Sequence, residues 1–140
     1  LALMNQTAKE IGMTATWVKS PDGYDAAGQY TTVRDLLTLT RAALRNTLLV
    51  EICSRYRATF AVSDGSTVTW TSTNRFLNPA DVLYDKRVYG MKGGFTDDAG
   101  CCLIATCQQG GKNYVAIIMG VDTYSARYEY ATALINAAAR

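Results

Sequence analysis

The stretch RVYGMKGGFTDDAGCCLIATCQQGGKNYVAIIMGV, from Arg87 to Val121, decides the fold of this chain. It contains three runs with the composition of β-strands: Arg87–Phe95, Cys101–Gln108 and Asn113–Val121. Only TDDAG and QGGK separate these runs, and both connections are short enough to be hairpin turns. Strands joined in this way pair with their neighbours in the sequence. The pattern therefore predicts a three-stranded antiparallel meander.

Upstream of the meander, two alternating runs indicate a separate β-hairpin. Tyr56–Val62 and Ser66–Thr73 flank the turn Ser63-Asp64-Gly65. Helices are predicted for four segments: Leu1–Ile11, Thr31–Asn46, Thr47–Cys53 and Thr123–Arg140. The sequence therefore predicts an α+β fold, in which helices cover an antiparallel sheet.

Two of the predicted helices show informative local signals. Thr32 and Asp35 have the spacing of a capping box, with Asp in place of the usual Glu or Gln. In the C-terminal segment, helical spacing places one group of residues on an apolar face that can lie on the sheet. This face comprises Tyr128, Ala131, Leu134, Ile135 and Ala138.

The composition limits the classes of function. With 140 residues, of which 49% are hydrophobic and 19% are charged, the chain is expected to form one globular domain over residues 1–140. A net charge of +2 gives no reason to expect nucleic acid or a membrane surface as a partner. Histidine is absent, which excludes Ser-His-Asp and Cys-His catalysis within these residues. We expect no metal site and no cofactor.

The four cysteines are best explained as small apolar residues of the sheet. In a strand, Cys101 and Cys107 lie on one face and Cys102 on the other. The spacing of these three and of Cys53 does not match that of a metal site, and it leaves a disulfide as an open alternative.

Lys92-Gly93-Gly94, near the end of the first meander strand, has two interpretations. A lysine at a strand end is commonly a solvated residue that protects a sheet edge. Alternatively, the strand forms one wall of a cleft for an extended, anionic ligand. The triplet alone does not decide between these interpretations.

Several separated segments together resemble the serine-type D-alanyl-D-alanine carboxypeptidases, the low-molecular-weight penicillin-binding proteins. The segments are LMNQTAKEIGMTATWVKSPDGYDAAGQY, YTTVRDLLTLTRAAL, TNRFL and GMKGGFTDDAGCCLIATCQQGGKNYVAIIMGV. They cover nearly the whole chain in order. Class A β-lactamases share a similar lysine strand, but FTDDAG followed by CLIAT is closer to the carboxypeptidases. The resemblance implies part of a DD-peptidase/β-lactamase-like fold.

The family uses an S-x-x-K pair with the nucleophilic serine, an S-x-N loop and a K-T-G strand. By resemblance, Lys92 is the lysine of K-T-G and a catalytic residue, while Gly93, Gly94, Phe95 and Thr96 bind substrate. The main-chain N–H of Phe95 is expected to line the oxyanion hole. Glycine at the threonine position removes a hydroxyl that binds the substrate carboxylate, at a cost of roughly 1.5–3 kcal/mol.

The other two family elements are missing from these residues. No serine is followed three positions later by lysine, and the single S-x-N, beginning at Ser72, lies too far along the chain to match the family loop. We therefore interpret residues 1–140 as the C-terminal portion of a DD-peptidase catalytic domain that lacks both segments. The chain is expected to be inactive alone. Alternatives are a non-catalytic module that binds peptidoglycan peptides or a protein, and a truncated product without function.

The resemblance also implies partners and a location. The ligand would be a peptidoglycan stem peptide or a β-lactam, bound weakly or not at all by this chain alone, outside the cytoplasmic membrane. Asn113–Val121 would form a long apolar sheet edge without its family neighbour. We expect this edge to mediate self-association or to pair with the missing N-terminal half, unless another element such as the first helix covers it.

Overall fold

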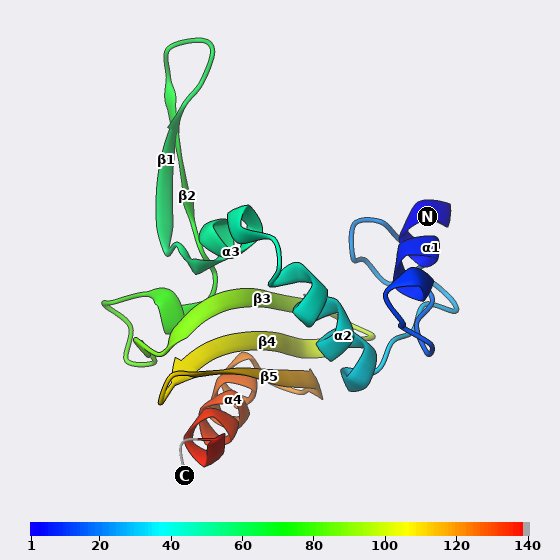
Figure 1. The fold of residues 1–140 in the computed structure, drawn as a ribbon. Coiled ribbons are helices and arrows are strands. Elements are labelled where there is room, and N and C mark those ends of the chain that lie inside the picture. Colours follow the sequence, from blue (N-terminus) through cyan, green and yellow to red (C-terminus); the bar gives the residue numbers. More distant parts are fainter. Residues whose placement is uncertain (139–140) are drawn as a thin grey trace.

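A computed structural model describes residues 1–138, in which helices lie on both sides of a three-stranded sheet (Figure 1). This arrangement confirms the predicted α+β class. The elements are α1 (Ala2–Glu10), α2 (Val33–Ala43), α3 (Thr47–Ser54), β1 (Arg57–Ala61), β2 (Thr67–Thr71), the 3-10 helix η1 (Arg75–Leu77), β3 (Val88–Thr96), β4 (Gly100–Gln109), β5 (Lys112–Val121) and α4 (Tyr124–Ala138). Within residues 1–138, no helix has the length and apolar character needed to cross a bilayer.

Strands β3, β4 and β5 form an antiparallel sheet in this order, which confirms the predicted meander. Every boundary of these three strands lies within one residue of its predicted position. Gly100, Gly110 and Gly111 lie at the two turns and have positive φ angles, which glycine adopts without the strain of a side chain. Strands β1 and β2 pair with each other in a second sheet, which confirms the predicted separate hairpin.

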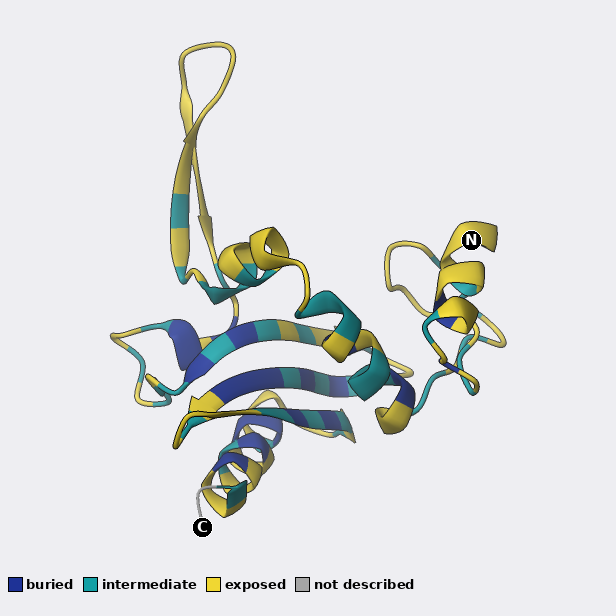
Figure 2. Cartoon of the chain, in the orientation of Figure 1, coloured by how far each residue is buried: buried dark blue, intermediate teal, exposed yellow. Residues whose placement is uncertain are grey.

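Helix α4 covers one face of the sheet and completes the hydrophobic core. Its residues Tyr128, Ala131 and Ile135 belong to the same buried cluster as Leu103 and Ala105 of β4. Figure 2 shows that buried residues are concentrated on β4 and on α4. The central strand is therefore the most protected element of the sheet, and removal of its apolar surface from water is the main stabilising contribution.

Tyr128 also connects α4 to the segment that precedes β3. Its hydroxyl accepts a hydrogen bond from the N–H of Arg75 and donates one to the carbonyl of Thr73, both at 3.2 Å. The tyrosine ring meets Phe76 edge-on, with ring centroids 5.0 Å apart. These contacts fix η1 against the helix and thereby the entry of the chain into β3.

The predicted apolar face of the C-terminal helix is wrong at one position. Leu134 is 49% exposed, whereas Ile135 is buried and Ala138 is half-buried. Successive helical residues are about 100° apart, so Leu134 lies at the border of the buried arc. Arg127, one turn before Ala131, takes a buried position instead. The last two residues of the predicted helix, 139 and 140, lie outside the described residues.

Helices α2 and α3 lie on the opposite side of the sheet from α4 (Figure 1). Helix α3 contacts β3, and α2 contacts β5. The alternative prediction that the first helix covers Asn113–Val121 is wrong, because α1 stands away from the sheet (Figure 1). Helix α2 contacts β5 but adds no strand to its edge.

Asp35 ties α2 to the N-terminal loop. It is 3% exposed, and its Oδ2 accepts hydrogen bonds from the N–H of Ala15 at 2.8 Å and from Oγ1 of Thr16 at 2.7 Å. Thr32 caps the helix as predicted, because its hydroxyl accepts the N–H of Asp35 at 3.1 Å. The Asp35 carboxylate thus accepts hydrogen bonds from the loop and not from the N–H of Thr32. The capping box is therefore only half formed.

The cysteines occupy the positions that strand alternation predicted. Cys101 and Cys107 are buried on the α4 face, whereas Cys102 on the other face is half-buried. Together with Cys53 they are free thiols, so the disulfide alternative is wrong.

The register of α4 can be tested with two adjacent substitutions. Ile135→Ala should destabilise the chain by about 2–5 kcal/mol, because it leaves a cavity in the core. Leu134→Ala is the matched control, and we expect it to cost no more than about 0.5 kcal/mol, as is usual for surface positions. Urea unfolding followed by circular dichroism measures both. Equal losses would contradict the packing of α4 described above.

Candidate functional site on strand β3

Lys92 is the central residue of β3 and is exposed. Its Nζ donates a hydrogen bond to the neighbouring carbonyl of Gly93. Phe95 packs against Tyr124 of α4, with ring centroids 5.4 Å apart. Because side chains alternate along a strand, Gly93 and Phe95 face α4, whereas Lys92 and Gly94 face away from it.

Strand β3 has a free edge, because among residues 1–138 it pairs with β4 alone. Its N–H and C=O groups on that edge are available to an extended ligand. The edge runs past Lys92, so a ligand strand and an ammonium group can be engaged together.

A cavity of about 460 Å³ lies beside Lys92. Its lining comprises Asp22, Gly23, Tyr24, Lys92, Gly94, Phe95, Thr96, Ala99 and Cys102. Four of the five predicted site residues therefore lie around one cavity. The fifth, Gly93, is not part of the lining and faces the helix instead.

The loop that precedes α2 reaches the end of β3 through Asp25. One carboxylate oxygen accepts the hydroxyl of Thr96 at 2.5 Å, and the other accepts the N–H of Asp98 at 3.3 Å. The Thr96 hydroxyl oxygen also accepts the N–H of Ala99 at 3.1 Å. The sequence did not indicate this contact, because it joins segments about 70 residues apart and depends on the complete fold.

The second feature that sequence reasoning missed is Arg127. Its Nη1 donates to the carbonyls of Gly94 at 3.2 Å and Cys102 at 3.3 Å, which connects α4 to both β3 and β4. The guanidinium carbon lies 4.7 Å from the ring centroid of Tyr124 and 5.1 Å from that of Tyr128. Only 6% of the residue is exposed. The sequence contained one signal for this contact. Arg127 lies four residues before Ala131, on the helix face that is otherwise apolar.

Gly93 leaves space beside this arginine. A Cβ atom at position 93 would lie 3.6 Å from Nη1 of Arg127, an ordinary van der Waals distance. The φ angle of Gly93 is not positive, so a side chain there is free of backbone strain. At Gly94 an added Cβ would meet no atom within 4 Å. The glycine at position 93 is thus not required for packing.

Asp22 contributes a negative charge to the rim of the same cavity. The hydroxyl of Ser20 donates to its Oδ1, and the N–H of Tyr24 donates to this atom at 3.2 Å. The Ser20 hydroxyl first, and the Tyr24 N–H second, lower the pKa of the Asp22 carboxyl below its ordinary value. The cavity therefore has a cation on the strand side and a carboxylate on the loop side.

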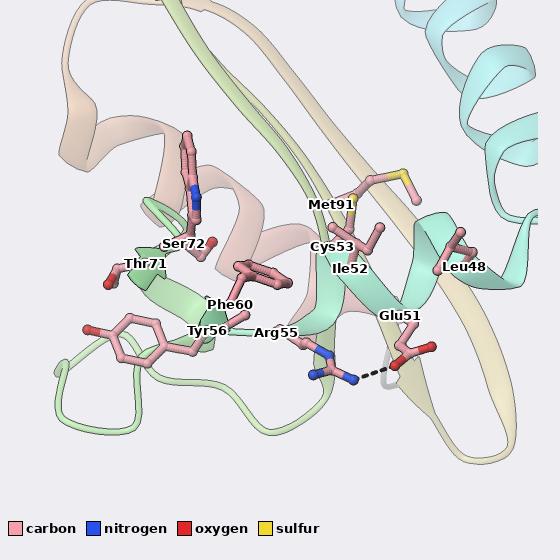
Figure 3. A pocket seen from close by; sticks show the side chains of 12 residues that line it. Leu48, Glu51, Ile52, Cys53, Arg55, Tyr56, Phe60, Thr71, Ser72 and Met91 are labelled. Carbon is pink, nitrogen blue, oxygen red and sulfur yellow. Dashed lines mark hydrogen bonds and ion pairs between the residues drawn. The ribbon is translucent and has the colours of Figure 1, made fainter. Parts of the chain in front are cut away.

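Another cavity, of about 630 Å³, lies away from Lys92. Figure 3 shows it between α3, the hairpin and Met91, with the ion pair between Glu51 and Arg55 at its rim. Its other lining is mostly apolar. Ser72 lies at its wall, where the serine Oγ accepts the N–H of Asn74 at 3.2 Å as part of a turn.

Among residues 1–138, no three His, Cys, Asp or Glu side chains lie close enough together to hold a metal ion. The charged groups described at the site are thus the Lys92 ammonium, the buried Arg127 guanidinium and the carboxylates of Asp22 and Asp25, beside the open main chain of β3.

Comparison with known proteins connects this geometry to a family. A family model described as D-alanyl-D-alanine carboxypeptidase matches residues 1–123. Among curated relatives, the carboxypeptidase DacF of Bacillus subtilis is 25% identical over 133 residues, which are 95% of this chain and 33% of the relative. DacD of Escherichia coli is 30% identical over 136 residues, 96% of this chain and 32% of the relative. The chain thus spans about a third of the length of these relatives.

Solved structures agree with the sequence matches. The Streptomyces K15 DD-transpeptidase has a TM-score of 0.85 and 27% identity, with 96% of this chain and 52% of that chain covered. Penicillin-binding protein D2 from Listeria monocytogenes, in its cefotaxime-bound form, has a TM-score of 0.78 and 29% identity. The match covers 96% of this chain and 53% of that protein.

Proposed function

Since this chain belongs to the D-alanyl-D-alanine carboxypeptidase family, we propose that residues 1–140 supply the lysine-bearing wall of the peptide cleft in such an enzyme. They would form the C-terminal portion of its catalytic domain. The observation that supports this role best is the cavity on β3, where Lys92, Gly94, Phe95 and Thr96 lie together.

Each of these residues has a role that suits an extended peptide with a terminal carboxylate. The Lys92 ammonium attracts the carboxylate, and the free edge of β3 offers main-chain groups for strand-like pairing. The N–H of Phe95 would stabilise the oxyanion, and Thr96 with Gly94 would shape the wall. The ligand class is a peptidoglycan stem peptide ending in D-Ala-D-Ala, or a β-lactam.

Gly93 should make this wall a weak binder. The threonine hydroxyl of the family's K-T-G strand is missing, so one hydrogen bond to the ligand carboxylate is lost. Arg127 lies directly behind Gly93 and adds positive potential there. Its buried guanidinium is already engaged by two carbonyls, however, so it replaces the missing hydroxyl only in part.

Hydrolysis needs groups that residues 1–140 do not contain. They include no S-x-x-K pair, so no serine has the neighbouring amine that activates it as a nucleophile. We therefore propose that the chain is inactive alone and acts with segments that supply this pair and the S-x-N loop. The absence of the pair also favours the second candidate function, a non-catalytic module that binds peptidoglycan peptides or a protein. Because stem peptides are found in the cell wall, both functions imply a location outside the cytoplasmic membrane.

The edge of β5 is the proposed contact with a partner segment. Among the described residues, β5 pairs with β4 alone, so one of its edges has no strand neighbour. Val115 and Ile117 of this strand, with Leu37 of α2 and the exposed Leu134, line an apolar hollow beside that edge. An added strand would satisfy the main-chain groups and cover these side chains. We propose that the N-terminal half provides it, or a second copy when this chain is alone.

Peptide binding tests the role of Lys92. Nα,Nε-diacetyl-L-Lys-D-Ala-D-Ala, titrated into the chain by NMR, should bind at least about tenfold more weakly to Lys92→Ala, because a charge-assisted bond of about 1.5 kcal/mol is lost. Lys112→Ala, which removes an exposed lysine far along the chain, is the control. Unchanged affinity in Lys92→Ala would refute the proposed wall.

Covalent labelling tests the claim that the chain is inactive alone. Incubation with a fluorescent penicillin should leave the chain unlabelled, since no serine here has an activating lysine. Electrophoresis under denaturing conditions detects the label, and a complete relative such as DacF serves as the positive control. A labelled band for this chain would show that it contains its own nucleophile.

Light scattering after size-exclusion chromatography tests the β5 edge. The chain should elute as a dimer or larger species whose fraction grows with concentration. Ile117→Lys places a charge on this edge and should shift the equilibrium toward the monomer. A monomer at every concentration would contradict pairing between copies.

A further inference from the structure

A cavity of about 390 Å³ lies between the sheet, α2 and the loop that joins α1 to α2. Its apolar lining includes Met13 of the loop, Leu39 of α2 and Met119 of β5. The volume lies within the range of small-ligand pockets, which are lined mainly by apolar side chains. This cavity is separate from the one beside Lys92, although Ala99 borders both.

The loop that forms one wall of this cavity is held on two sides. Asp35 of α2 accepts hydrogen bonds from the N–H of Ala15 at 2.8 Å and from the hydroxyl of Thr16 at 2.7 Å. Further along the loop, the bonds accepted by Asp25 connect it to the end of β3. The walls are thus fixed without a ligand, so binding does not have to order them.

Two aromatic residues from separate parts of the loop line the cavity together. The N–H of Trp17 donates to the carbonyl of Tyr30 at 2.9 Å, and the N–H of Tyr30 donates to the carbonyl of Trp17 at 3.1 Å. Directly opposite residues of an antiparallel pair have their side chains on the same face. Trp17 is 45% exposed and Tyr30 is 57% exposed, so both rings are accessible to an apolar or cationic group.

The charged residues of this lining, Asp25 and Asp98, are both acidic. Both are exposed, and none of the three ion pairs within residues 1–138 involves either of them. The Lys19 Nζ lies 5.8 Å from the ring centroid of Trp17, but Lys19 belongs to the lining of a different cavity. A ligand that joins an ammonium group to an apolar body therefore complements both the carboxylates and the apolar side chains.

We propose that this cavity binds a small organic cation, in which an ammonium group is attached to an apolar or aromatic body. The body lies beside the rings of Trp17 and Tyr30, and the ammonium group lies beside Asp98. Asp25 adds negative potential, although both of its carboxylate oxygens already accept hydrogen bonds. The site uses neither Lys92 nor the edge of β3, so the proposal goes beyond the proposed function and does not depend on it.

Three probes with one phenylethyl skeleton and different end groups test the proposal: phenethylammonium, 2-phenylethanol and 3-phenylpropionate. The chain has two tryptophans, so NMR titration can follow one indole N–H signal for each, and Trp70→Phe assigns them. Phenethylammonium should shift the Trp17 signal to saturation and leave that of Trp70 unchanged, because Trp70 lines another cavity.

The end group should set the order of affinity. Phenethylammonium should bind about two- to fivefold more tightly than 2-phenylethanol, the range expected for an exposed ion pair. The anionic 3-phenylpropionate should bind most weakly, because the carboxylates of the lining repel it. The difference between the ammonium and the alcohol should disappear at about 1 M salt, where exposed charges are screened.

Variants assign the two parts of the site. Asp98→Asn should give the ammonium and the alcohol the same affinity, whereas Asp97→Asn, which changes the adjacent carboxylate outside the lining, should preserve the preference. Tyr30→Ala should weaken both probes, because it removes one ring of the site. Equal affinity of the unmodified chain for the ammonium and the alcohol, or equal losses in the two aspartate variants, would overturn the proposal. A shift of the Trp70 signal alone would overturn it as well.

Discussion

The packing of α4 against the meander is the interaction on which the candidate site depends. Strand β3 has a single strand neighbour among the described residues, so hydrogen bonds to β4 alone do not fix its position. Tyr128 secures the segment before β3, and Arg127 binds the carbonyls of Gly94 and Cys102 near its far end. One helix thus holds both ends of the strand that bears Lys92.

In the same arrangement, the residues around Lys92 contribute little to the hydrophobic core. Gly93 and Gly94 add no side chains to the core, and the space around them tolerates a Cβ atom. The residue at position 93 can therefore gain a side chain without disturbing the sheet. The loop that carries Asp22 and Tyr24 is similarly independent of the core, because both residues are exposed and Asp25 bonds this loop to the end of β3.

Much of the fold could be predicted because its signals are local. Short turns join the three strands of the meander, and alternation correctly placed Cys101 and Cys102 on opposite faces. The buried face of α4 was harder to predict. Leu134 and Ile135 are both apolar, and only the orientation of α4 on the sheet determines which of them is buried. The resemblance to the carboxypeptidases identified the family, which residue chemistry alone would not have done, since K-G-G is a weak signal.

The sequence by itself determined the family, the antiparallel meander and the place of Lys92 on its first strand, because these depend on short-range patterns and on motifs that can be read in order. Tertiary structure alone decided that Arg127 lies behind Gly93 and that the loop of Asp22 faces Lys92 across a cavity. The physical reason is sequence distance. Contacts between residues 34 to 70 positions apart follow from how the helix and the loop pack on the sheet, and no local periodicity encodes that packing.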